Sequence, residues 1–174
     1  MFRIAGLIHK QNKKMKIKIR KAKLSDVKTI LLLVLKLAEY EKKTVGDVKL
    51  TTDKIIKHAF CSKLYFNLLV AETENELVGY ALYFFTYAAS LGAPILYLED
   101  LFVLENYQRQ GIGTKFLTQL AKIAANHHCC RMEWHTFSWN RSAIDFYQSM
   151  SAVLRPDLIQ VRLQYDALQQ LAIT

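Results

Sequence analysis

The chain has 174 residues, of which 52% are hydrophobic and 22% charged, and this length and composition predict a folded globule with a substantial core. Its longest helical apolar run, Ile30 to Leu35, is well short of the roughly 18 residues that a membrane span needs, so no membrane partner is expected. The formal net charge of +9 lies entirely in residues 1–23, so the rest of the chain lacks the excess positive charge that a nucleic-acid partner requires.

Hydrophobic periodicity and turn residues predict alternating groups of strands and helices in the order β-α-α-β-β-β-α-β-α-β. The expected strands cover about 16–20, 65–72, 77–87, 95–104, 130–137 and 158–163, and the expected helices about 26–41, 52–62, 114–127 and 140–150. Ser25 and Asn140 are candidate N-caps. This order indicates a mixed α/β (α+β) sheet with an antiparallel front half.

The basic N-terminal stretch is interpreted separately from the rest. Residues 1–14 are expected to be a disordered basic extension, and residues 15–174 a single domain. The apolar start of the extension is too short, and its charges come too late, for a secretory signal. A basic tethering arm is the functional alternative.

The cysteines are Cys61, Cys129 and Cys130, an odd number without spaced pairs. Neither a disulfide framework nor a zinc site follows from this spacing, so no metal is expected. The run from His127 to Cys130 is interpreted as a helix end leading into a strand. Free thiols are typical of a reducing compartment, and a cytoplasmic location is therefore expected.

The segment from Val103 to Gly113 joins a buried strand pattern to a helix pattern. It contains a polar turn and two glycines one residue apart, Gly111 and Gly113. Such a loop can direct several backbone N–H groups at one anion at the start of a helix. The third glycine of a dinucleotide loop and the Gly-Lys-Ser/Thr order of a P-loop are both missing. A pyrophosphate cradle is predicted, and a strand–turn–helix joint with glycines for packing is the structural alternative.

Three motifs in register carry a family resemblance: residues 97–103 (Tyr-Leu-Glu-Asp-Leu-Phe-Val), the loop formed by Gln108, Gly111 and Gly113, and residues 139–147 (Trp-Asn-Arg-Ser-Ala-Ile-Asp-Phe-Tyr). Together they resemble the spermidine/spermine and thialysine N-acetyltransferase branch of the GNAT superfamily, over about residues 16–150. The resemblance implies the GNAT fold, a mixed central sheet of about six to seven strands flanked by about four helices. It also implies acetyl-CoA as the acetyl donor and a homodimer.

The resemblance places the donor between the central strand, the glycine loop and the last helix. A backbone N–H near residues 101–103 is implied as the donor that holds the thioester carbonyl. The expected cofactor-binding residues are Leu101, Phe102, Val103, Gln108, Arg109, Gln110, Gly111, Ile112, Gly113, Thr114, Asn140 and Tyr147.

Acetylation of an amine requires a neutral nitrogen, and Glu99, on the central strand, is the candidate catalytic base. A carboxylate with an ordinary pKa near about 4.3 is a weak base, so partial burial or an intervening water is needed. The resemblance implies the same role, through water. A strand carboxylate in an ion pair is the structural alternative. Asp100 points to the opposite face if the strand is regular, although a β-bulge would change this.

Tyr147 is the candidate catalytic acid. It lies seven residues after Asn140, on about the same face of the predicted helix. Its phenol can donate a proton to the departing thiolate, and the general-acid tyrosine of the family matches this position. A core aromatic is the structural alternative.

The acceptor site is expected at Tyr40, Glu41, Glu99 and Asp100, because Tyr40-Glu41 matches a pair that lines the amine site in this branch. A solvated helix end is the structural alternative for that pair. Three departures weaken the match to polyamine enzymes: Tyr87 is followed by no acid, Ser151 replaces a glycine, and residues 155–157 replace a Glu-Gly-Trp segment. A shorter or less acidic site is therefore expected.

The sequence thus predicts an N-acetyltransferase that transfers an acetyl group directly to a primary amine of a small molecule, such as a polyamine, a diamine or a lysine-like amino acid, within a ternary complex. No cysteine falls in the three motifs, which argues against a covalent cysteine intermediate. Two alternatives remain: acetylation of a protein or peptide amine, and a non-catalytic acyl-CoA-binding module.

Overall fold

The computed structural model describes residues 16–74 and 76–173, so the expected basic extension at 1–14 lies outside the described residues. The chain divides into two compact units, one ending at Trp134 and the other beginning at His135. The expectation of a single domain over 15–174 stays a prediction.

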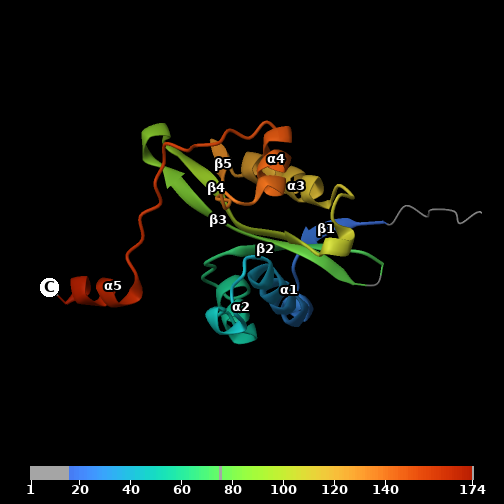
Figure 1. Cartoon of the computed structure of the whole chain (residues 1–174), viewed down its shortest axis with the longest axis horizontal. Helices are drawn as coiled ribbons and strands as arrows, with labels where there is room; N and C mark the ends of the chain where they lie inside the picture. Colours follow the sequence, from blue (N-terminus) through green and yellow to red (C-terminus); the bar gives the residue numbers. More distant parts are fainter. Residues whose placement is uncertain (1–15, 75, 174) are drawn as a thin grey trace, which may run out of the picture. The chain divides into compact units, whose positions relative to one another are not determined.

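The first unit contains a five-stranded mixed sheet with the order β1-β2-β3-β4-β5 (Figure 1). The strands are β1 (Lys18–Lys21), β2 (Asn67–Glu72), β3 (Leu77–Ala88), β4 (Ala93–Val103) and β5 (Arg131–Glu133). The first four strands pair antiparallel, whereas β4 and β5 pair in parallel. A parallel pair needs a crossover connection, and the helix α3 provides it. The predicted mixed sheet with an antiparallel front half is confirmed.

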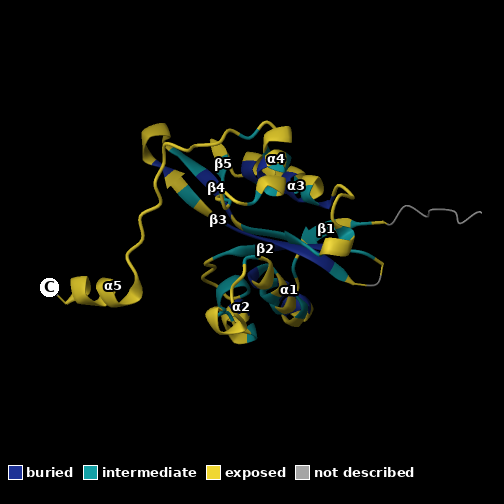
Figure 2. Cartoon of the chain, in the orientation of Figure 1, coloured by how far each residue is buried: buried dark blue, intermediate teal, exposed yellow. Residues whose placement is uncertain are grey.

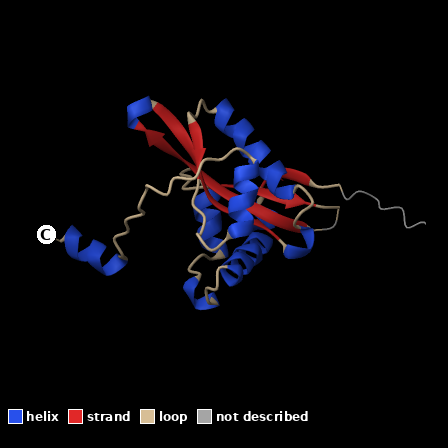
Figure 3. Ribbon diagram, turned by 45° about the horizontal axis from the view of Figure 1, so that its top comes forward, coloured by secondary structure: helices blue, strands red, loops and turns tan. Residues whose placement is uncertain are grey.

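Helices cover both faces of this sheet (Figures 1 and 3). The helices α1 (Val27–Tyr40) and α2 (Thr52–Ala59) lie on one face, and α3 (Ile112–Asn126) lies on the other. The core on the α1 side includes Ile30, Ile55 and Tyr80, each at most 1% exposed. Figure 2 shows the buried residues concentrated along the central strands and on the sheet-facing sides of the helices.

The second unit contains the helices α4 (Arg141–Ser149) and α5 (Tyr165–Ala172). The side-chain oxygen of Asn140 accepts a hydrogen bond of 3.2 Å from the N–H of Ala143, so the predicted N-cap of α4 is confirmed. The sequence did not predict α5. The described residues therefore contain five α-helices, one more than the four that were expected.

The predicted strand at 158–163 is wrong, because these residues form no strand and are exposed. The sheet of the described residues therefore has five strands rather than six to seven. The alternation of apolar and polar residues is present, but a strand also needs the backbone groups of a neighbour, and no described strand pairs with this segment. The predicted strand at 130–137 is real but shorter, ending at Glu133.

Candidate functional site

The glycine loop connects β4 to α3 through a short turn at Glu105–Tyr107 and two left-handed residues, Arg109 (φ 57°) and Gly111 (φ 77°). The side-chain amide of Gln108 donates a hydrogen bond of 2.9 Å to the carbonyl of Val103, which ties the loop back to the strand end. A Cβ at Gly111 would meet open space, so glycine is favoured there by the backbone angle and not by crowding.

The loop ends with an array of backbone donors at the start of α3. The first intrahelical hydrogen bond runs from the N–H of Lys115 to the carbonyl of Gly111, at 3.0 Å. The N–H groups of Ile112, Gly113 and Thr114 precede it, and they form no hydrogen bond within the described part of the chain. These donors and the helix dipole favour an anion at this point, as expected for a pyrophosphate cradle.

A β-bulge interrupts β4 just before the loop. Leu98 lies opposite Tyr83 and Asp100 lies opposite Leu82, so Glu99 is the extra residue on β4. The bulge shifts the alternation by one position and places Asp100 on the same face as Leu82, which belongs to the core under α1. A regular strand would instead have turned Asp100 to the face opposite Glu99.

The strands β4 and β5 separate at the same point. Their parallel pairing ends with Tyr97 opposite Glu133, whereas β4 continues to Val103. Over residues 98–103, the edge of β4 that faces away from β3 pairs with no strand of the described residues. Backbone groups on this edge, including those of residues 101–103, are therefore available to an extended ligand.

Asp100 is partly buried and accepts a hydrogen bond of 2.9 Å from the hydroxyl of the fully buried Tyr80. Burial raises the pKa of Asp100 to about 6, and the negative charges of Glu99 and Glu41 add to the rise, while the hydrogen bond from Tyr80 and the positive charge of Lys43 oppose it. Burial also raises the pKa of Tyr80, with the charge of Asp100 as the next cause. The negative charges of Asp100, Glu41 and Glu99 all add to the rise in the pKa of Tyr80, and α1 contacts β4. These three carboxylates are called the acidic cluster below.

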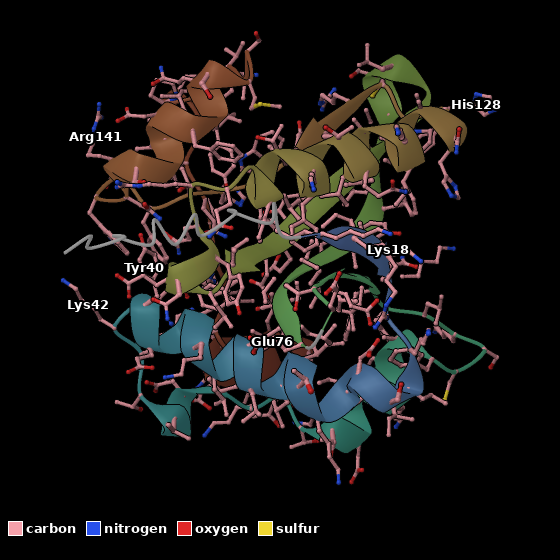
Figure 4. The ribbon with its side chains drawn as sticks, turned by 90° about the vertical axis from the view of Figure 1, so that its right-hand side faces the viewer. Lys18, Tyr40, Lys42, Glu76, His128 and Arg141 are labelled. Carbon is pink, nitrogen blue, oxygen red and sulfur yellow. The ribbon has the colours of Figure 1, made fainter. Side chains whose placement is uncertain are left out.

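The acidic cluster joins the end of α1 to the bulge of β4. Glu41 is the C-cap of α1, its side chain is 19% exposed, and it forms an ion pair with Lys43. Tyr40 is exposed at the end of the same helix (Figure 4). Three of the four residues predicted for the acceptor site, Glu41, Glu99 and Asp100, are thus close enough for their charges to act on one another. Lys43 is not among the residues that the sequence predicts for this site, although it lies only two residues after Glu41.

Asn140 and Tyr147 belong to the second unit, where both lie on α4 or at its start. Tyr147 is partly buried, and its ring contacts that of Phe146 at a centroid distance of 5.3 Å. The remaining predicted cofactor residues belong to the first unit.

Other sequence features have plain structural roles. The run from His127 to Cys130 is the predicted connection from a helix to a strand, and the ring of His127 packs on Phe85 at 4.6 Å. Cys129 and Cys130 are free thiols. In the described ranges, no three His, Cys, Asp or Glu residues are grouped so that they could hold a metal ion. No helix within 16–74 or 76–173 is long and apolar enough to cross a membrane.

The bulge of β4, its separation from β5 and the glycine loop together place the N-terminus of α3 after an open strand edge, an arrangement suited to an extended ligand with an anionic group. The chain belongs to the acetyltransferase (GNAT) family, whose sequence pattern matches residues 34–151. It is therefore an N-acetyltransferase that acts on amines, and enzymes of this family use acetyl-CoA.

The chain is similar to two curated proteins and to a solved structure. It is 35% identical over 142 residues to the thialysine N-epsilon-acetyltransferase of Sus scrofa, covering 77% of this chain and 82% of that protein. It is 34% identical over 142 residues to the spermidine/spermine N(1)-acetyltransferase-like protein 1 of Homo sapiens, covering 78% of this chain and 20% of that protein. An integron cassette protein from V. cholerae superposes with a TM-score of 0.76 at 25% identity, covering 92% and 99% of the two chains. The branch named by the sequence motifs is confirmed.

Proposed function

We propose that this protein transfers the acetyl group of acetyl-CoA directly to a primary amine of a small molecule, namely a polyamine, a diamine or a lysine-like amino acid, within a ternary complex. The acidic cluster at the bulge of β4 is the observation that supports this most. Aliphatic amines are ammonium ions at neutral pH, so the three carboxylates would attract them. Thialysine and the polyamines named in the two relatives are amines of this kind.

The donor is proposed to bind along the edge of β4 and the glycine loop. The N–H groups of residues 112–114 would hold its pyrophosphate, and a backbone N–H at 101–103 would hold the thioester carbonyl. The proposed cofactor contacts are Leu101, Phe102, Val103, Gln108, Arg109, Gln110, Gly111, Ile112, Gly113, Thr114, Asn140 and Tyr147. The N–H groups that precede the first helical hydrogen bond of α3 support the pyrophosphate position.

The chemistry is assigned to Glu99 and Tyr147. Removing a proton from an ammonium with a pKa near ~10.4 at pH 7 costs roughly 4–5 kcal/mol, so an acceptor for that proton is needed. Glu99 is exposed at the bulge, where it can pass the proton to solvent through a water molecule. The neutral nitrogen then bonds to the carbonyl carbon, the carbon–sulfur bond breaks, and the thiolate takes a proton from the phenol of Tyr147. The nitrogen loses its second proton to solvent as the amide forms, and solvent returns a proton to the Tyr147 phenolate.

The reaction is tested by the release of the CoA thiol from acetyl-CoA with spermidine, 1,4-diaminobutane, lysine, thialysine and short peptides. Turnover with one or more of the free amines supports the proposal. Turnover with peptides alone would overturn the small-molecule acceptor, and silence with every amine would overturn the proposed function as a whole.

The acid assignment is tested by Tyr147→Phe, with Tyr165→Phe as the matched control in the same unit. Loss of the proton donor is expected to lower kcat by about 10²- to 10⁴-fold, with acetyl-CoA binding retained. The control removes the same hydroxyl from an exposed tyrosine and is expected to keep full activity. Unchanged turnover in Tyr147→Phe would refute the assignment.

We also propose that the protein is a homodimer located in the cytoplasm. The three free cysteines are compatible with a reducing compartment. Sedimentation equilibrium at micromolar concentration measures the oligomeric state, and a monomer under those conditions would contradict the proposed dimer.

A further inference from the structure

The helix α1 ends in a tight turn, in which the next residues hydrogen-bond back to the last turn of the helix. The N–H of Lys42 donates to the carbonyl of Glu39 at 3.0 Å, and the N–H of Lys43 donates to the carbonyl of Ala38 at 2.9 Å. Lys42 has the left-handed angle that this helix ending requires, with φ of 60°. The turn therefore fixes the backbone position of Lys43 next to the C-cap, Glu41.

The side chain of Lys43 lies against the acidic cluster. Its ammonium pairs with the carboxylate of Glu41, and its charge is among those that act on Asp100. The Lys43 side chain is 52% exposed, whereas that of Glu41 is 19% exposed. Lys43 thus adds one cation beside the acidic cluster, paired with Glu41 and still accessible to solvent. Lys42, one residue earlier, extends outward from the end of the helix (Figure 4).

We propose that Lys43 determines the specificity of the acceptor site. At the end of the site near Glu41, it disfavours an acceptor with a second cation and favours an acceptor with an anionic group. This inference rests on the proposed function, because it takes the acidic cluster as the acceptor site. The reacting ammonium pairs with Glu99 and Asp100. The far end of the acceptor then meets the ammonium of Lys43, which repels a second ammonium and pairs with a carboxylate.

The physical basis is the distribution of charge. Without Lys43, three carboxylates would favour a polycation at every position of the site. With Lys43 paired to Glu41, the negative charge that remains lies on the bulge of β4, next to the separated edge of the strand. A diamino acid, which carries an ammonium at one end and a carboxylate at the other, matches this pattern better than a diamine of the same length.

The test compares lysine with 1,5-diaminopentane, which differs from lysine only by the absence of the α-carboxylate. In Lys43→Gln, kcat/KM for lysine is expected to fall about two- to fivefold through KM, because exposed ion pairs have effects of this size. For 1,5-diaminopentane, kcat/KM is expected to rise, and the ratio of the two values should change by about tenfold. Lys43→Glu should shift the ratio further in the same direction.

Lys42→Gln is the matched control, since it removes the same charge one residue away, and the ratio is expected to stay at the wild-type value. An unchanged ratio in Lys43→Gln, with both acceptors turned over, would show that Lys43 only closes the helix end, and it would refute the inference while leaving the proposed function intact. Silence of the wild-type enzyme with every amine would overturn the proposed function and this inference with it.

Discussion

Asp100 is a partly buried carboxyl with a raised pKa, and removal of its charge should stabilise the protein. The carboxyl lies beside the fully buried phenol of Tyr80, and burial raises its pKa from the ordinary 3.8 to about 6. Asp100→Asn keeps an oxygen that accepts the hydrogen bond from Tyr80 and removes the charge. The substitution should therefore raise the free energy of unfolding wherever Asp100 is ionised in the wild-type protein.

The magnitude and the sign follow from the two pKa values. The folded and unfolded pKa values of Asp100 differ by about two pH units, which corresponds to about 3 kcal/mol in the free energy of unfolding. Because the folded state holds this proton more tightly than the unfolded state, Asp100 lowers stability progressively as the pH rises from about 4 to about 6, and its effect is constant above that range. The stability advantage of Asp100→Asn should therefore grow by about 2 kcal/mol between pH 4.5 and pH 8.

Urea unfolding at pH 4.5, 6 and 8, followed by circular dichroism, measures this difference directly. The amide introduced by Asp100→Asn also affects packing, but this effect does not depend on pH. It therefore cancels when the difference in the free energy of unfolding between variant and wild type is compared across pH values. Glu74→Gln, at an exposed position, serves as the control and should show no such growth. An Asp100→Asn advantage that is equal at pH 4.5 and pH 8 would refute the buried-charge argument.

Two further predictions concern the sheet. In Gly79→Ala, the added Cβ would lie 2.5 Å from a backbone carbonyl of β4, so the free energy of unfolding should fall by about 1–3 kcal/mol. In the control Gly46→Ala, the Cβ meets nothing closer than 3.7 Å, and the substitution should have little effect. Equal urea midpoints for the two variants would contradict this. Arg20→Met removes a guanidinium that donates to both Asp26 and Glu72 at 2.6–3.1 Å, and stability at pH 7 should fall by about 2–3 kcal/mol. The hydrogen bonds from Arg20 lower the pKa of both carboxyls, so wild-type stability is lost as the pH falls through their folded pKa values, and Arg20→Met should lose less between pH 7 and pH 3; parallel pH profiles would rule out this role.

The sequence alone determined the class of protein, because its signals are local. A strand, two glycines and a helix start within about a dozen residues, and the backbone geometry that they impose depends on neighbours in the chain. The N-cap at Asn140 is where the sequence predicts it. The order of such segments predicted the fold class, and the mixed sheet of the structure confirms that class.

The tertiary structure decided what depends on a partner elsewhere in the chain. The alternation at 158–163 is typical of a strand, but no described strand pairs with it. The bulge at Glu99 is defined by its register with β3, so the face on which Asp100 lies could not be determined from β4 by itself. The hydrogen bond from Tyr80 to Asp100 and the effect of the Glu41 charge on Asp100 join residues 20 or more positions apart. Burial, register and charge interaction are properties of pairs of segments, and only the folded chain brings those pairs together.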